Sequence, residues 1–448
     1  MTVQYYQREF ADFSRRWTGR DPAWLAPLRR SAIDRFAARG FPTPRDENWH
    51  FTSVAPIAEL EFQSLDSAGG LVDPSAVAPF AFGEDGSSQL VFINGHHAPS
   101  LSTRGAARSG VRVLDLASAM REVPDLLQRW LTTLALTEGE AFTALNTAFF
   151  RDGAIVCLPA NMELSEPIHL LFIADASAAK GVSHPRNLIV AGRNSRATVV
   201  ESYVSLTEAT YFTNAVTEVA VEEGATLRHY RIQRESGRAF HVGTTQVHQA
   251  RDSHYLSFSF ATGAALSRTN IYTMLDGEGA GATLDGLYMG ADEQHIDHQT
   301  RIDHAQPNCF SREVYKGILD GSSHGVFNGK VLVRPIAQKT DGKQSNNNLL
   351  LSDRARVDTK PQLEIFADDV KCTHGATVGR LDELALFYMK SRGIPADTAR
   401  TLLTFAFAAD VLQQIESVPV REMLERLTRE RFTGSATEEP VSAPAASR

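Results

Sequence analysis

A repeat of about 28 residues in the middle of the chain constrains the fold more than any other feature. Between residues 152 and 369, short runs of Val, Ile, Thr, Tyr and Phe alternate with polar residues, and Gly, Asn, Asp and Ser separate them. Segments around Ala197, Ala225, Ser253 and Ala282 resemble one another, at spacings of 28, 28 and 29. Short strands with this period and no helices between them predict a β-solenoid, whose stacked coils bury one continuous core.

The alternative for the same region is a β-sandwich or a barrel, in which turns recur every 8–12 residues or so. The longer repeat favours the solenoid, which we expect over residues 151–369. We expect residues 1–150 to be helical, with a short strand segment near 88–115. Residues 370–432 predict a helical C-terminal domain, and the Ser-, Ala-, Pro- and Glu-rich segment 433–448 predicts a disordered tail.

Composition excludes several classes of protein. The 448 residues are 43% hydrophobic and 22% charged, with a net charge of −8, and no cluster of Lys and Arg indicates nucleic-acid binding. The sequence has no run of about 18 apolar residues, so we expect no membrane span, and the first residues lack the apolar segment of a signal peptide. The cysteines Cys157, Cys309 and Cys372 are scattered and odd in number, which favours a reducing compartment, the cytoplasm.

The pair Cys372 and His374 is the first candidate for chemistry. Residues two apart in a strand point to the same face, so the thiol and the imidazole can meet one soft metal or sulfur species. The alternative is a small buried Cys beside a hydrogen-bonded His. Two ligands do not close a tetrahedral site, so other groups, including groups of another chain, would have to complete it.

A second candidate set consists of His295, His298, His304 and Cys309. Its spacing superficially resembles a metal cluster, but residues three apart in a strand face opposite sides, so His295 and His298 would diverge. His298 and His304 could share a face. The alternative is that these are histidines of a solenoid face with ordinary hydrogen-bond partners, and whether any of the four residues binds a metal stays open from the residues alone.

The chain contains no nucleophile elbow, phosphate-binding loop or dinucleotide-binding fingerprint. Such a long chain without these motifs favours a scaffold or a subunit over an enzyme. One alternative is a purely structural adaptor for a partner protein, with no metal role. Another is a carbohydrate-active β-helix enzyme, which would need clustered acids or a basic residue on one solenoid face.

An ordered set of motifs carries a resemblance to a known family. The motifs are Asp303-His304, Gly325–Lys330, Ala337–Gln344, Asn347–Ser352, Pro361–Ile365, Asp369–Gly379, Leu386–Tyr388 and Ser391–Ile394. With weaker similarity at Glu47–Trp49, the chain resembles the SufB/SufD family of iron–sulfur cluster assembly proteins. Within this family, the Lys-Cys-Thr-His-Gly-Ala form at residues 371–376 resembles the SufD branch. The SufB branch carries a Glu-His-Glu-Ala-like junction that is missing here.

The resemblance implies a mainly β protein: a right-handed parallel β-helix (solenoid) core flanked by N-terminal and C-terminal α-helical domains. It also implies pairing with SufB through the β-helices and a transient iron–sulfur cluster shared with SufB. The family histidine that matches His374 completes the cluster site, and the role of Cys372 is less certain. The resemblance leaves open whether a reduced flavin binds in the complex and whether the isolated chain forms a homodimer.

The resemblance further implies that the C-terminal helices bind SufC, an ABC-type ATPase. ATP would then act only through SufC, and the motion of SufC would reach the cluster site through these helices. The chain itself would be a non-catalytic scaffold subunit. The residues expected to bind SufC are Leu384, Phe387, Tyr388, Arg392, Leu403, Phe405, Phe407 and Val411.

Overall fold

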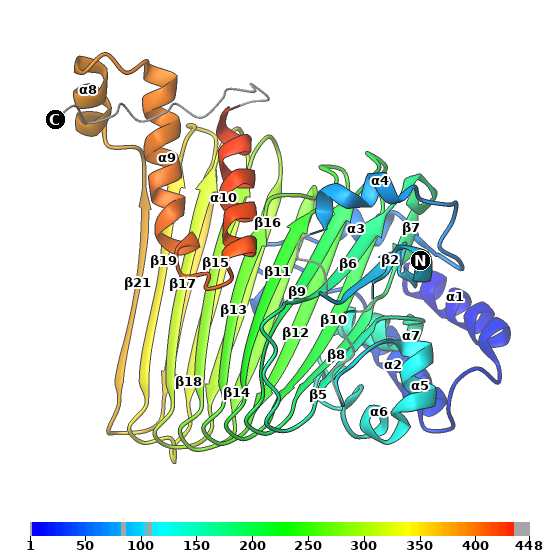
Figure 1. Cartoon of the computed structure of the whole chain (residues 1–448). Coiled ribbons are helices and arrows are strands. Elements are labelled where there is room, and N and C mark those ends of the chain that lie inside the picture. Colours follow the sequence, from blue (N-terminus) through cyan, green and yellow to red (C-terminus); the bar gives the residue numbers. More distant parts are fainter. Residues whose placement is uncertain (1, 82–86, 104, 106–109, 434–448) are drawn as a thin grey trace. The chain divides into compact units, whose positions relative to one another are not determined.

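The protein is a β-solenoid built from two long sheets, as the repeat predicted (Figure 1). The computed structural model describes residues 2–81, 87–103, 105 and 110–433. Within these residues the strands form an 11-stranded sheet, here the first sheet, and a 10-stranded sheet, the second sheet. The chain divides into two compact units, Met1–Arg380 and Leu381–Arg448.

The first sheet runs from the last coil to the first in the order β20-β18-β16-β14-β12-β10-β8-β5-β4, with β1 and β7 beside this path. Its strands are β20 (Arg356–Ile365), β18 (His324–Val333), β16 (His295–His304), β14 (Leu266–Leu275), β12 (Phe240–Gln249), β10 (Phe212–Val221), β8 (Arg186–Ala191), β5 (Ala154–Leu158), β4 (Arg112–Asp115), β7 (Gly181–Ser183) and β1 (Gln63–Ser64).

The second sheet runs in the order β21-β19-β17-β15-β13-β11-β9-β6-β2-β3. Its strands are β21 (Lys371–Gly379), β19 (Asp341–Leu350), β17 (Phe310–Leu319), β15 (Gly281–Gly290), β13 (His254–Ala261), β11 (Thr226–Arg234), β9 (Arg196–Ser205), β6 (Ile168–Ala174), β2 (Gln89–Ile93) and β3 (His96–His97).

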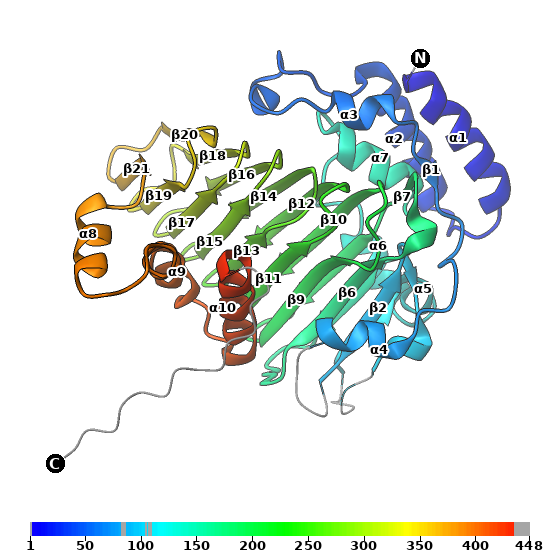
Figure 2. The same cartoon turned by 90° about the horizontal axis from the view of Figure 1, so that it is seen from above.

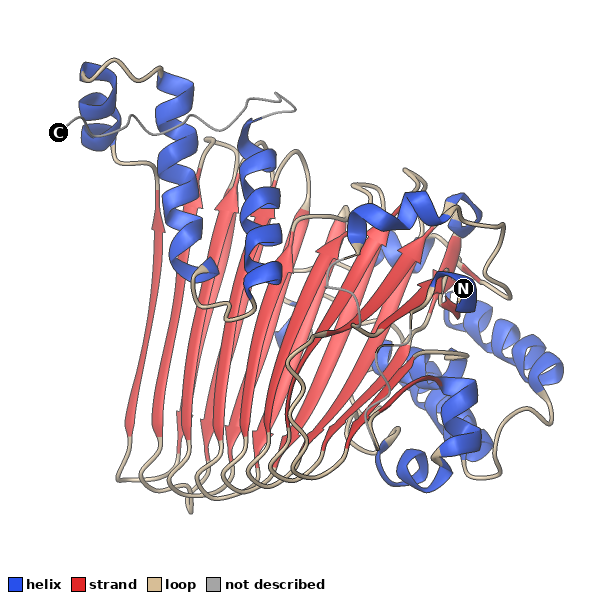
Figure 3. Cartoon of the chain, viewed as in Figure 1, coloured by secondary structure: helices blue, strands red, loops and turns tan. Residues whose placement is uncertain are grey.

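Helices precede and follow the long strands (Figure 3). The N-terminal helices are α1 (Thr2–Trp17), α2 (Leu25–Arg39), α3 (Ala55–Glu59), α4 (Pro74–Val77), α5 (Leu116–Glu122), α6 (Pro124–Trp130) and α7 (Ala141–Phe149), and the C-terminal ones are α8 (Glu383–Ser391), α9 (Ala396–Leu412) and α10 (Val418–Thr433). Among the described residues, no helix is both long enough and apolar enough to cross a membrane.

Each full coil gives one strand to each sheet. Even-numbered strands from β8 onward stack in the first sheet and odd-numbered strands from β9 onward stack in the second, all in parallel register. Figure 2 shows the two sheets as facing layers. Side chains alternate between the interior and the outer face of each sheet, so every second residue of a long strand enters the core between the layers.

The structure contains the repeat, but the sequence alignment assigned two residues, Ala197 and Ala282, to the wrong position within it. Backbone hydrogen bonds place one small buried residue at the same corner of successive coils, with spacings of 27 to 31 residues; the residues are Ser195, Ala225, Ser253, Ala280, Cys309 and Thr340. Ala197 lies opposite Leu227, and Ala282 lies opposite Tyr255. Residues two apart share a face of the strand, so a shift by two positions preserves the sequence pattern and is easily missed.

The solenoid extends further at both ends than the sequence indicated. Lys371–Gly379, expected in the helical C-terminal domain, is instead strand β21, which pairs with β19 along its whole length. At the other end, β2 and β4 of the predicted strand segment near 88–115 join the second and first sheets. Of the expected tail 433–448, Thr433 ends α10 and the remainder lies outside the described residues.

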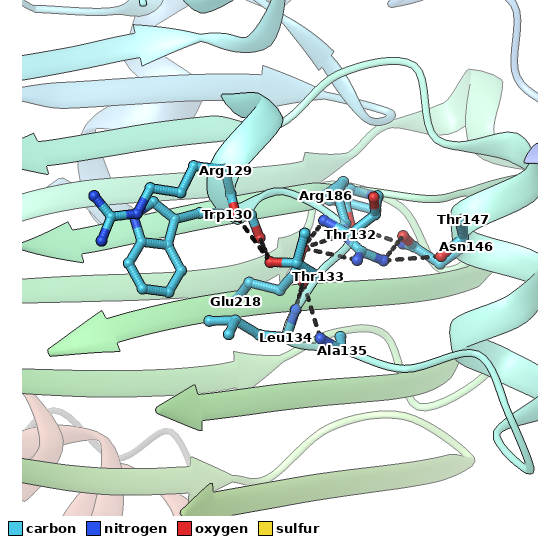
Figure 4. Close-up of polar contacts among 11 residues, drawn as sticks. Arg129, Trp130, Thr132, Thr133, Leu134, Ala135, Asn146, Thr147, Arg186 and Glu218 are labelled. Carbon is cyan, nitrogen blue, oxygen red and sulfur yellow. Dashed lines mark hydrogen bonds and ion pairs between the residues drawn. The ribbon is translucent and has the colours of Figure 1, made fainter. Parts of the chain in front are cut away.

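A buried ion pair fastens the N-terminal helices to the outer face of the first sheet (Figure 4). Glu218 on β10 accepts hydrogen bonds from Arg186 Nε at 3.0 Å and Nη2 at 2.7 Å. The same carboxylate accepts the backbone N–H groups of the loop that follows α6, at Thr132, Leu134 and Ala135, over 2.7–2.9 Å. Arg186 also donates to Asn146 and Thr147 of α7.

The interior of the last coils holds a buried acid. Glu313 on β17 is 1% exposed and lies in the inward row of the second sheet. Burial raises the pKa of Glu313 to about 7, although the hydrogen bond from Gln344 favours its charged form. The carboxyl therefore changes charge near neutral pH, unlike an acid at the surface.

Replacing Glu218 with Gln should lower the free energy of unfolding by about 3–5 kcal/mol, because the fully buried guanidinium of Arg186 loses its charged partner. Denaturant titration measures this change. Glu223→Gln, at an exposed carboxylate just after β10, is the matched control and should change stability by less than about 0.5 kcal/mol. Equal effects of the two substitutions would contradict the assigned role of the ion pair.

Glu313 should make the protein less stable as the pH rises. Between its unfolded pKa and its folded pKa of about 7, only the folded chain holds the proton, so the free energy of unfolding falls with increasing pH. In Glu313→Gln, the decrease in the free energy of unfolding between pH 5 and pH 8 should be smaller than in wild type by roughly 2–3 kcal/mol. Denaturant titrations at both pH values measure this decrease, and Glu293→Gln, at an exposed carboxylate, is the control. A decrease in Glu313→Gln as large as in wild type would refute the prediction.

Candidate functional site

The last coil of the solenoid ends in two strand edges. β20 is the terminal strand of the first sheet and β21 the terminal strand of the second. Within the described residues, β20 pairs only with β18, and β21 pairs only with β19. Each strand therefore presents one row of backbone N–H and C=O groups that no neighbouring strand satisfies, and such edges are templates for pairing with another chain.

Cys372 and His374 lie on β21 and share one face of it. Cys372 stands in register with Gly342, and His374 with Gln344, both in the inward row of β19. The prediction that a strand brings this thiol and imidazole to one side is therefore confirmed. Because β21 is the last strand, its inward row is not covered by a further coil, and His374 is exposed.

Cys372 is half-buried and packs against the buried apolar cluster of Val331, Val333, Ala337 and Ala367. A methyl group placed on Gly342 would lie 3.4 Å from the Cys372 sulfur, in ordinary van der Waals contact. Burial raises the pKa of the Cys372 thiol. In the isolated chain the thiol is thus mostly protonated, and metal binding would have to release its proton.

His374 has no hydrogen-bond or ion-pair partner among the described residues. In the same part of the chain, no group of three or more His, Cys, Asp or Glu side chains comes together in a way that could hold a metal ion. The site consequently offers one exposed imidazole and one half-buried thiol at an open strand edge.

The second candidate set does not converge. His295 faces the outer side of the first sheet, where its Nε2 lies 2.8 Å from Thr52 Oγ1. His298 and His304 both face the interior, but six strand residues separate them by roughly 20 Å. His298 stacks on Tyr288, with ring centroids 5.1 Å apart, and His304 contacts Ser311 at 3.0 Å. Burial lowers the pKa of each of the three imidazoles to about 4.

Cys309 is a corner residue of the solenoid. It is fully buried, and its Sγ donates to the Gly277 carbonyl at 3.3 Å. Burial raises the pKa of its thiol to about 11, so the reactive thiolate is scarce at neutral pH. The small size that the corner requires explains this cysteine without a role in chemistry.

The C-terminal unit carries exposed apolar side chains on its first helix. On α8, Leu384 is 75%, Phe387 67% and Tyr388 58% exposed. Arg392, just after the helix, donates to the Tyr388 hydroxyl at 3.1 Å and lies over its ring. The residues expected to bind a partner on α9 are less accessible: Leu403, Phe405 and Phe407 are half-buried, and Val411 is buried.

Sequence reasoning missed two residues behind His374. In the inward row of the second sheet, Glu313, Gln344 and His374 stand in register on β17, β19 and β21. They are separated by 31 and 30 residues, close to the repeat length. Projecting the repeat forward from β17 was the signal that could have found them.

Comparison with known proteins gives a consistent result over nearly the whole chain. Residues 2–170 match the family model for the SufBD protein N-terminal region, and residues 172–407 match the model for the SufBD core domain of the SUF system for FeS cluster assembly.

Three curated relatives illustrate the similarity. An iron-sulfur cluster assembly SufBD family protein of Synechocystis is 36% identical over 89% of each chain. The iron-sulfur cluster assembly protein SufD of Escherichia coli is 32% identical over 92% of this chain and 94% of its own length, and SufD of Bacillus subtilis is 28% identical over 90% and 93%. With its two-sheet solenoid and both family regions, this chain belongs to the SufBD family of the SUF system for iron–sulfur cluster assembly.

Proposed function

We propose that this chain is a SufD-like scaffold subunit that pairs with a SufB-like partner and supplies His374 to a nascent iron–sulfur cluster. One observation carries the proposal: an exposed imidazole lies beside a thiol on the unpaired last strand of the solenoid. The extensive similarity to two proteins named SufD supports the assignment to that branch.

Pairing through the last coil follows from the open edges of β20 and β21. Their free backbone groups are satisfied when a second solenoid adds its own terminal strands, and this mode of strand addition needs no special side chains. A second copy of this chain offers the same edges, so a homodimer of the isolated chain is the expected competing state.

The cluster is cargo that the complex assembles and releases. Thiolate and imidazole are suitable ligands for iron–sulfur species, and two side chains from this chain leave positions for the partner to fill. Exposure of His374 and the raised pKa of the Cys372 thiol favour His374 as the main ligand, with Cys372 in an accessory role. A bond to one exposed imidazole suits a cluster that a carrier must remove.

The exposed face of α8 is the proposed docking site for the ATPase partner, SufC. This face exposes the apolar side chains of Leu384, Phe387 and Tyr388, and an exposed apolar patch of this kind marks a surface that a partner protein buries. Only Arg380–Asp382 separate β21 from α8, so movement of α8 by the ATPase would reach the strand that carries His374. The chain would thus transmit ATP-driven motion without catalysing a reaction itself.

The free cysteines Cys157, Cys309 and Cys372 suit a reducing compartment, and we place the complex in the cytoplasm. A flavin bound to the complex would be visible in the same purification that tests the cluster, through its absorption and fluorescence.

Replacing His374 with Ala should leave the complex with SufB and SufC intact but reduce the reconstituted cluster at least tenfold. The side chain is exposed, so its loss should not unfold the chain. Anaerobic co-purification followed by visible absorption and iron analysis measures both properties. Thr373→Ala, at the neighbouring position on the opposite face of β21, is the matched control. A full cluster in the His374 variant would reduce the chain to a metal-free adaptor.

Replacing Leu384 and Phe387 together with Ser should abolish binding of the ATPase partner, because the docking surface loses its apolar area. Pull-down of SufC and the ATPase rate of the assembled complex report the loss, while pairing with SufB should persist. Leu136→Ser, at a comparably exposed leucine before α7, should retain SufC. Undiminished SufC binding by the α8 variant would move the docking site elsewhere.

A further inference from the structure

Behind His374 the solenoid interior contains a hydrogen-bonded pair of polar side chains. Gln344 Nε2 donates to Glu313 Oε2 at 2.6 Å. Gln344 is 3% and Glu313 1% exposed. Above its pKa of about 7 Glu313 is a carboxylate, whose oxygens only accept hydrogen bonds, so this contact assigns the amide nitrogen of Gln344 to the Glu313 side and leaves its oxygen, Oε1, as a free acceptor.

A glycine of the opposite sheet fixes this arrangement. A Cβ on Gly329 of β18 would lie 2.3 Å from Gln344 Nε2. The amide therefore reaches across the interior into a recess that only glycine leaves open. Held between Gly329 and Glu313, Gln344 has little freedom to turn its amide group over.

The other end of the same amide lacks a partner. Gln344 Oε1 is buried and accepts no hydrogen bond in the described part of the chain. A buried acceptor left in this state costs free energy. The next position in its row, one strand further toward the open edge, is His374, and neighbouring strands lie only about 4.8 Å apart. A ring N–H of His374 is the donor that this row brings within reach.

We infer that Gln344, held by Glu313 and by the recess at Gly329, is a positioning residue. A turn of the exposed His374 ring, which has no partner among the described residues, brings one ring N–H to Gln344 Oε1 and leaves the other ring nitrogen free to bind a metal at the strand edge. This inference rests on the proposed function of His374 as a cluster ligand. Metal-binding histidines generally donate their second ring N–H to such a partner, which fixes the tautomer and the ring orientation.

The tautomer of His374 tests the inference in the isolated full-length chain. Labelling histidine with ¹⁵N and comparing the spectrum with that of His374→Gln assigns the ring, and long-range ¹H–¹⁵N correlations distinguish its protonated nitrogen from the bare one. At a pH where the ring is neutral, wild type should show one tautomer. Gln344→Met keeps the side-chain volume but removes the acceptor, and should give a mixture of tautomers.

Two further variants separate positioning from folding. Gly329→Ala places a methyl group against the Gln344 amide and should give the same mixture with Gln344 still present. Lys343→Met, on the same strand but facing the outer side and exposed, should match wild type. A tautomer mixture in wild type, or an unchanged single tautomer in Gln344→Met, would overturn the inference.

The assembled complex supplies a second measurement. Gln344→Met should retain a cluster but lose it to an iron chelator about tenfold faster than wild type, the effect usual for loss of such a partner, whereas Lys343→Met should not. If His374→Ala retains its cluster, the proposed function fails, but the tautomer of the isolated chain still decides whether Gln344 orients the ring.

Discussion

The parallel backbone ladder is the constraint on which the whole solenoid depends. Each strand satisfies the N–H and C=O groups of the next coil, and the final coil has no successor. The two ends of the stack differ in whether the outermost strands are paired. At the first coil, β3 folds back antiparallel on β2, and β4 on β5. At the last coil, β20 and β21 remain parallel edges. The end that carries Cys372 and His374 is thus the end at which, among the described residues, two strand edges stay unpaired.

Glycines make the interior able to hold polar side chains. A Cβ on Gly243 would overlap the Arg231 guanidinium, one on Gly317 would overlap the Tyr288 ring, and one on Gly329 would overlap the Gln344 amide. Each recess admits a large side chain from the opposite or adjacent strand where a methyl group would block it. The core is therefore partly polar, and its polar row reaches the open edge at His374.

The strand pattern could be predicted from the sequence to different degrees in different places. The alternation and repeat in residues 152–369 indicated stacked strands, because a strand residue reveals its face by its position. The same rule correctly placed Cys372 and His374 on one side of β21. It could not tell Ala197 from a corner residue such as Ser195, since positions two apart look alike. The long-range pair of Arg186 and Glu218 carries no signal in local patterns.

The sequence by itself determined the solenoid, the family motifs and the shared face of Cys372 and His374, because these follow from the short-range period of a strand and from the spacing between coils. Only the tertiary structure decided which coil comes last and which side chains lie behind the candidate ligand. Burial and partners depend on contacts between distant segments: Cys309 became an inert corner residue, His295, His298 and His304 separated, and Gln344 and Glu313 came into line with His374. The stacking of coils, rather than any local motif, creates the environment in which the imidazole would act.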